Sequence, residues 1–87
     1  MSDLNNLRNE IDEIDEKIVR LLLERFDAVR NVAEYKKIHG LEIFQKDREI
    51  EVLKKISEKI NNPKYKKYIL QIYAEILETS KASQSQS

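Results

Sequence analysis

The apolar residues of the first third of the chain recur at a heptad spacing. One seam carries them at positions 4, 11, 18 and 32, and a second seam carries them at positions 7, 14, 21, 28 and 35. This pattern predicts one long helix, about residues 4–39, that packs against another helix along its whole length. Asp3 is placed to cap the start of this helix, and His39-Gly40 is placed to end it because glycine readily adopts a positive φ.

Two shorter helices are predicted in the rest of the chain. Its single glycine, Gly40, and its single proline, Pro63, divide it into three segments. Apolar residues at three- and four-residue steps then predict helices of about residues 46–60 and 63–83, with Asn62 capping the last one. The chain is therefore expected to be one all-α domain, residues 1–87. Ile43 and Phe44 are expected to face the core from the connecting loop, and the polar tail 83–87 is expected to fray.

The length of the first helix predicts a partner chain. About 35 helical residues rise roughly 50 Å, whereas a compact small domain of about 100 residues has a radius of gyration of only about 13 Å. The two shorter helices cannot cover that length. Because the seam continues over the whole helix, we expect an intertwined antiparallel helical homodimer.

Composition excludes several function classes. The 87 residues carry 16 Lys and Arg against 16 Asp and Glu, so the net charge of zero argues against binding to nucleic acid or to a membrane surface. With no cysteine and one histidine, His39, the chain has no disulfide, thiolate nucleophile or metal-ligand set. No signal peptide or membrane-spanning segment is apparent, so we expect a cytoplasmic protein without a cofactor.

Charged residues interrupt the apolar pattern at informative places. Arg25 occupies a seam position, where an unpaired interior cation costs several kcal/mol. It is either a polar residue that fixes the register or the partner of an anionic ligand. Lys36 follows eleven residues later, which returns to within about 20° of the same face. Arg8 precedes Arg25 by about 25 Å of helix, so it could reach the same ligand only from the partner of an antiparallel dimer.

The shorter helices carry similar exceptions. Glu49 lies on an apolar stripe, although an acid in a first helical turn also has an ordinary stabilising role. Ser80 and Gln84 form an i, i+4 polar pair where the apolar stripe of the last helix ends. Such a pair is also expected in an amphipathic helix that simply runs out into solvent. Taken together, these residues predict a cationic pocket for a small dianion. Without a nucleophile or metal, such a pocket would act through positioning and preorganised charge.

These residues resemble those of a known family, the all-helical chorismate mutases. The similarity covers about residues 4–84 and rests on four motifs: LRNEIDEIDEKIVRLLLER at 7–25, VAEYK at 32–36, DRE at 47–49 and ILETSKASQ at 76–84. The resemblance implies an intertwined dimer of three-helix chains with shared active sites. It also implies that the chain converts chorismate to prephenate, a step toward phenylalanine and tyrosine, without a cofactor.

The resemblance also assigns roles to individual residues. By position, Arg25 is similar to the residue that grips one substrate carboxylate, and Arg8 to the one that reaches the other carboxylate from the partner subunit. Lys36 is similar to a lysine that contacts a carboxylate and the ether oxygen, and Gln84 to the second donor to that oxygen. Arg48 is similar to an arginine that approaches a carboxylate.

The remaining candidates would shape the pocket. Glu49 is similar to the acid that holds the ring hydroxyl, and Ser80 to a hydroxyl in the lining. Gln45 stands where several relatives have an acidic residue, so we expect a hydrogen bond or helix cap at this position to differ from theirs. Gln45, Val32 and Leu77 are candidates for the lining only.

Two other functions remain compatible with the sequence. A lyase of the same fold, which eliminates pyruvate from isochorismate, would use a similar cationic pocket. A non-catalytic helical dimerisation module would use Arg25 only to fix its register, and then Arg25→Leu would be neutral or stabilising by up to a few kcal/mol.

Overall fold

The computed structural model describes residues 3–85 and contains three helices, α1 (Leu4–Ile38), α2 (Lys46–Lys59) and α3 (Pro63–Ser85). The all-helical fold predicted from the sequence is confirmed. The helix limits agree with the expected ones to within two residues. The largest difference is at the end of α3, which continues to Ser85 and so keeps Gln84 in the helix. The expected fraying of the tail falls partly on residues 86 and 87, which lie outside the described residues.

Local side-chain chemistry sets the helix ends. The Asp3 carboxylate accepts a hydrogen bond from the Asn6 backbone N–H at 2.8 Å, which caps α1. Gly40 has a φ of 67°, the left-handed conformation in which glycine ends a helix without strain. The Asn62 side chain accepts from the Lys64 N–H at 3.0 Å and caps α3. In contrast, Gln45 stands at the N-cap of α2 without a side-chain cap bond.

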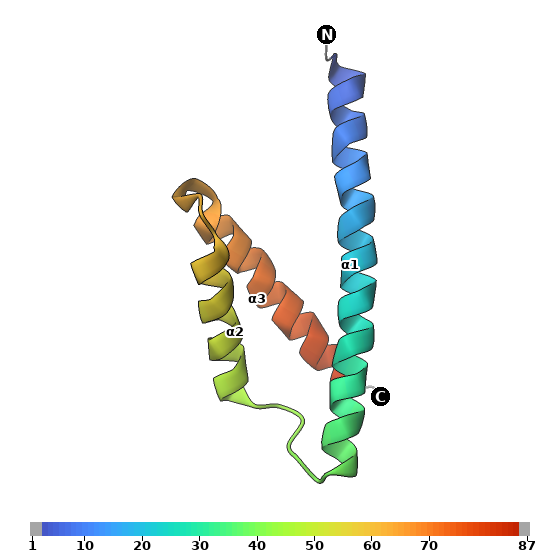
Figure 1. Ribbon diagram of the computed structural model, residues 1–87, viewed down its shortest axis with the longest axis vertical. Coiled ribbons are helices and arrows are strands. Elements are labelled where there is room, and N and C mark those ends of the chain that lie inside the picture. The colour runs from blue at the N-terminus through green and yellow to red at the C-terminus, as the bar shows by residue number, and fades with distance from the viewer. Residues whose placement is uncertain (1–2, 86–87) are drawn as a thin grey trace.

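The two shorter helices cover only part of α1. α2 and α3 form an antiparallel pair, and the C-terminal end of α3 meets the C-terminal half of α1, while the N-terminal half of α1 projects beyond both (Figure 1). The molecule therefore measures 58 × 26 × 16 Å, with a radius of gyration of 16.4 Å. A compact domain of this length has a radius of gyration of about 12 Å. None of the helices in the described residues is long and apolar enough to cross a membrane.

The C-terminal half of α1 has two different apolar faces. Its more covered residues recur at three- and four-residue steps and form one stripe: Leu22, Arg25, Val29, Ala33 and Lys36. At 100° per residue, this stripe lies about 90° around the helix from the heptad seam of the same half. The seam residues Leu21, Val32 and Tyr35 stay 60%, 50% and 58% exposed. The chain thus packs on α3 beside its heptad seam and leaves most of the seam exposed.

Little of the apolar surface is buried within one chain. In the described part of the chain, Ala33 at 4% exposure is the only buried apolar residue, and Ser80 at 5% is the only buried polar one. Ile43 is half-buried, whereas Phe44, which was expected to face the core, is 47% exposed. The accessible surface is 7532 Å², against about 5,400 Å² for a typical monomer of this mass.

Candidate functional site

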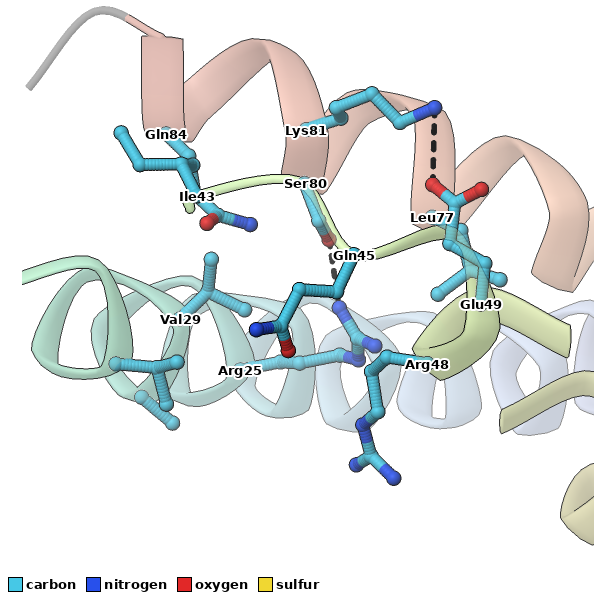
Figure 2. A pocket seen from close by; sticks show the side chains of 12 residues that line it. Arg25, Val29, Ile43, Gln45, Arg48, Glu49, Leu77, Ser80, Lys81 and Gln84 are labelled. Atoms are coloured by element: carbon cyan, nitrogen blue, oxygen red, sulfur yellow. Dashed lines mark hydrogen bonds and ion pairs between the residues drawn. The ribbon is translucent and has the colours of Figure 1, made fainter. Parts of the chain in front are cut away.

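A cleft of about 290 Å³ lies where α1, α2, α3 and the loop after α1 come together (Figure 2). Most of the site residues predicted from the sequence line it: Arg25, Val32, Gln45, Arg48, Glu49, Leu77, Ser80 and Gln84. They come from positions up to 59 residues apart, yet the helix packing gathers them at one place. The two predicted residues that are not part of this lining are Lys36 and Arg8.

Arg25 is the half-buried cation of the cleft. Its guanidinium donates a hydrogen bond to the Ser80 hydroxyl at 2.6 Å and lies 5.7 Å from the centre of the Tyr73 ring. The Ser80 hydroxyl in turn donates to the Ile76 carbonyl at 2.7 Å, so its orientation is fixed. Within residues 3–85 no carboxylate forms an ion pair with Arg25. The geometry therefore presents a partly desolvated positive charge that lacks an anionic partner.

Lys36 lies at the edge of the cleft. Its ammonium donates to the backbone carbonyl of Ile43 at 2.8 Å, and Ile43 is itself a lining residue. The contact ties the loop to α1 and holds the lysine Nζ close to the wall of the cleft. The expectation that Lys36 and Arg25 share one side of α1 agrees with their places in the same half-buried stripe.

Arg48 contributes to the lining, but its charge is directed elsewhere. Its guanidinium donates to the Glu51 carboxylate at 2.6 Å and points away from Ser80 (Figure 2). Lys55 also contacts Glu51, at 3.1 Å. The hydrogen bond and charge of Lys55, and then those of Arg48, lower the pKa of Glu51 below its ordinary value. Because these side chains are more than half exposed, the contacts hold Arg48 only weakly.

Glu49 faces a cation that comes from another helix. The Lys81 ammonium lies 2.9 Å from the Glu49 carboxylate across the α2–α3 junction, and 3.3 Å from Glu78 on its own helix (Figure 2). The hydrogen bond to Glu49, followed by the one to Glu78, raises the pKa of Lys81 above its ordinary value. The Lys81 side chain therefore remains a cation beside the cleft.

Arg8 lies far from this cleft in its own chain. It precedes Arg25 by seventeen residues on α1, a rise of about 25 Å, and is exposed on the projecting half of the helix. This position agrees with the expectation that Arg8 cannot reach the cleft of its own chain.

Sequence reasoning missed four residues of the lining: Ala28, Val29, Ile43 and Lys81. Helical spacing could have indicated three of them. Ala28 and Val29 follow Arg25 by three and four residues on α1, and Lys81 follows Leu77 by four on α3. The loop residue Ile43 carries no such periodic signal.

Comparison with known proteins relates the chain to one family. The family model described as chorismate mutase type II matches residues 7–85. A bifunctional chorismate mutase/prephenate dehydratase of Aquifex aeolicus is 38% identical over 82 residues, which cover 88% of this chain and 22% of that protein. A chorismate mutase of Methanocaldococcus jannaschii is 33% identical over 84 residues, which cover 95% of this chain and 85% of that protein.

A solved structure is similar over almost the whole chain. The chorismate mutase (form II) of Thermus thermophilus superposes with a TM-score of 0.88 at 27% identity, covering 94% of this chain and 93% of that one. The chain thus spans most of the length of two of these relatives, but less than a quarter of the bifunctional Aquifex protein.

Proposed function

Because the chain belongs to the chorismate mutase type II family, we propose that it converts chorismate to prephenate in the cytoplasm, a step toward phenylalanine and tyrosine. The reaction is a Claisen rearrangement, in which the ether C–O bond breaks as a C–C bond forms within the same molecule. A site for it must hold a flexible dicarboxylate in a folded conformation. It must also stabilise the negative charge that develops on the ether oxygen.

The observation that carries this proposal is the environment of Arg25. Its half-buried guanidinium is aimed by the buried Ser80 hydroxyl and has no carboxylate partner in the described residues. A cation in such a position is stabilised by an anionic ligand. A carboxylate of chorismate would supply that anion and would accept the charge-assisted, bidentate contacts that arginine favours.

Lys36 and Gln84 are the proposed donors to the ether oxygen. Gln84 lines the cleft from α3, and the Lys36 ammonium lies beside the lining residue Ile43 from the α1 side. Two donors that converge from opposite walls would stabilise the charge where it grows in the transition state. Each such donor contributes about 3 to 4 kcal/mol in enzymes with comparable hydrogen-bond sites.

Arg48 and Glu49 are proposed to bind the remaining polar groups of the substrate. The contact of Arg48 with Glu51 is exposed and worth at most about 1 kcal/mol, so a substrate carboxylate can replace it at little cost. Glu49 would accept a hydrogen bond from the ring hydroxyl. Gln45, Val32 and Leu77 would form the surrounding wall.

A second copy of the chain is proposed to supply Arg8 and to cover the open surface. The excess of about 2,100 Å² in accessible area per chain is of the size that a permanent homodimer buries. The exposed seam of α1 continues past the single-chain contacts, which supports an antiparallel pairing. In such a dimer, the N-terminal half of one α1 lies beside the C-terminal half of the other, and Arg8 approaches the partner's cleft.

A direct assay tests the proposed activity. Purified protein should remove the absorbance of chorismate, and prephenate should be identified as the product. Salicylate and pyruvate formed from isochorismate would instead establish the lyase of the same fold. Failure to convert either compound by a folded dimer would favour the non-catalytic helical module.

A further inference from the structure

Lys81 forms an ion pair unlike the others in the described residues. The other four ion pairs each join residues three or four positions apart on one helix. The pair of Lys81 with Glu49 instead joins α3 to α2, and both partners line the cleft. Their side chains are only 33% and 34% exposed, so the pair is better shielded from water than the other ion pairs. Lys81 therefore adds a third cation to the lining, beside Arg25 and Arg48, and its partner Glu49 also lines the cleft.

The geometry of this pair constrains the Glu49 carboxylate. Lys81 contacts its Oε1 at 2.9 Å, and the ammonium also lies 6.0 Å from the centre of the Phe44 ring. A glutamate side chain otherwise has several rotatable bonds, and holding it in one rotamer costs conformational entropy. A charged hydrogen bond from the neighbouring helix offsets that cost before any ligand binds. Oε2 keeps its capacity to accept a hydrogen bond from a ligand hydroxyl.

The pair also changes the charge that a ligand meets. An isolated Glu49 carboxylate at the wall would repel a dianion, because like charges within a few ångströms interact unfavourably in a partly shielded cleft. The Lys81 ammonium compensates that charge locally. Glu78, a second carboxylate that contacts Lys81, does not line the cleft and its side chain is 64% exposed. Glu78 competes with Glu49 for the Lys81 charge, but its high exposure keeps this competition weak.

We propose that Lys81 is a positioning residue. It holds the Glu49 carboxylate in place to accept a hydrogen bond from the ring hydroxyl of the substrate. It also compensates the negative charge of Glu49, which would otherwise repel the substrate carboxylates. This inference rests on the proposed function, because the ring hydroxyl belongs to chorismate. Lys81 acts here through Glu49 and does not bind the substrate itself. The two effects concern ground-state binding, so they bear on KM more than on kcat.

Steady-state kinetics of a double-mutant cycle tests the inference. Lys81→Met should raise KM for chorismate about 3- to 10-fold, with kcat changed less than about 2-fold, the effect of a partly lost charged hydrogen bond. In a Glu49→Gln background, Lys81→Met should have no further effect, because residues that act as one unit are non-additive. Lys81→Arg should restore KM to within about 2-fold of the wild type. Glu78→Gln is the matched control, since it removes a carboxylate that contacts Lys81 outside the cleft and should leave KM unchanged.

The outcomes separate this inference from the proposed function. Wild-type protein that does not convert chorismate overturns both. Active wild-type protein in which the effects of Lys81→Met and Glu49→Gln add overturns only the role of Lys81, because the lysine then acts on the substrate directly. An unchanged KM in Lys81→Met has the same consequence.

A second measurement does not depend on turnover or on the stability of the Lys81 variants. The pKa of Lys81, followed by NMR of its side chain, should fall toward its ordinary value in Glu49→Gln and fall less in Glu78→Gln, since Glu49 makes the larger contribution. An equal or larger fall in Glu78→Gln would contradict the pairing on which the inference depends.

Discussion

The two halves of α1 have opposite surroundings, although both carry the same heptad pattern. In the N-terminal half, the seam residues from Leu4 to Ile18 are 47% to 59% exposed. In the C-terminal half, a second stripe beside the seam is covered: Arg25 contacts Ser80 of α3, Lys36 contacts the loop at Ile43, and Ala33 is only 4% exposed. One chain therefore builds the walls of a cleft but leaves most of the apolar seam exposed.

The contrast separates the face of α1 that folds the chain from the face that we propose for assembly. The stripe through Leu22, Val29 and Ala33 closes the chain on itself and places Arg25 beside Ser80. Most of the seam lies about 90° away and stays exposed, and there we expect a second copy to pack. Substitutions on the two faces should consequently have different effects, which the following variants separate.

The largest effect is expected from Ile14→Glu on the uncovered seam. A carboxylate there would have to be buried unpaired in the dimer, which costs several kcal/mol. Sedimentation should show a shift from a dimer of about twice 10.3 kDa toward the monomer, with a loss of helical signal in far-UV circular dichroism. Asn9→Glu introduces the same group on the opposite face of α1 and should leave the dimer intact. A stable dimer of Ile14→Glu would contradict the assembly through the seam.

Arg25→Leu should abolish activity without loss of the fold. The variant removes the cation proposed to bind a carboxylate, and truncating such a partner costs about 2 to 5 kcal/mol, or roughly 30- to 4,000-fold in kcat/KM. The dimer should persist in sedimentation. Arg30→Leu, which removes an outward arginine paired with Asp27 at 3.6 Å, is the matched control. If Arg25→Leu is as active as the control, Arg25 is a register residue and not part of the site.

Ala33→Leu should disturb the closed face of α1 only. The added methylene groups would force α3 away from α1, and overpacking of this kind costs about 1 to 3 kcal/mol. The melting temperature should fall by roughly 4 to 8 °C for each kcal/mol of stability lost, and the dimer should be retained. Ala82→Leu, at an exposed position of α3, should have little effect. Equal melting temperatures for the two variants would show that the contact of α1 with α3 contributes little to stability.

The helices could be predicted from the sequence because local chemistry determines them. Asp3 caps α1, Gly40 ends it, and Asn62 with Pro63 begins α3, each through contacts within four residues. The heptad pattern was equally readable. However, the regular heptad drew attention away from the second stripe. That Leu22 and Val29 belong to a packed face can be seen only once α3 is known to lie beside α1.

The site residues that break a local pattern could be predicted from the sequence, whereas contacts between distant segments could not. Arg25 interrupts an apolar seam, and Ser80 interrupts an apolar stripe, so both were visible as exceptions to a pattern. The partner of Lys81, Glu49, lies 32 residues away on another helix, and no spacing rule connects them. The present contacts of Lys36 with Ile43 and of Arg48 with Glu51 likewise depend on how the loop and α2 are oriented.

The most direct measurement of the shared site mixes two inactive dimers. Arg8→Ala and Arg25→Ala should each be nearly inactive with chorismate, because every site lacks one arginine. When equal amounts exchange subunits at random, half of the dimers are mixed, and each mixed dimer contains one site with both arginines. About a quarter of wild-type activity should therefore return with the rate of subunit exchange. Activity that stays at the level of the separate variants, although exchange is demonstrated, would contradict a site completed by Arg8 of the second chain.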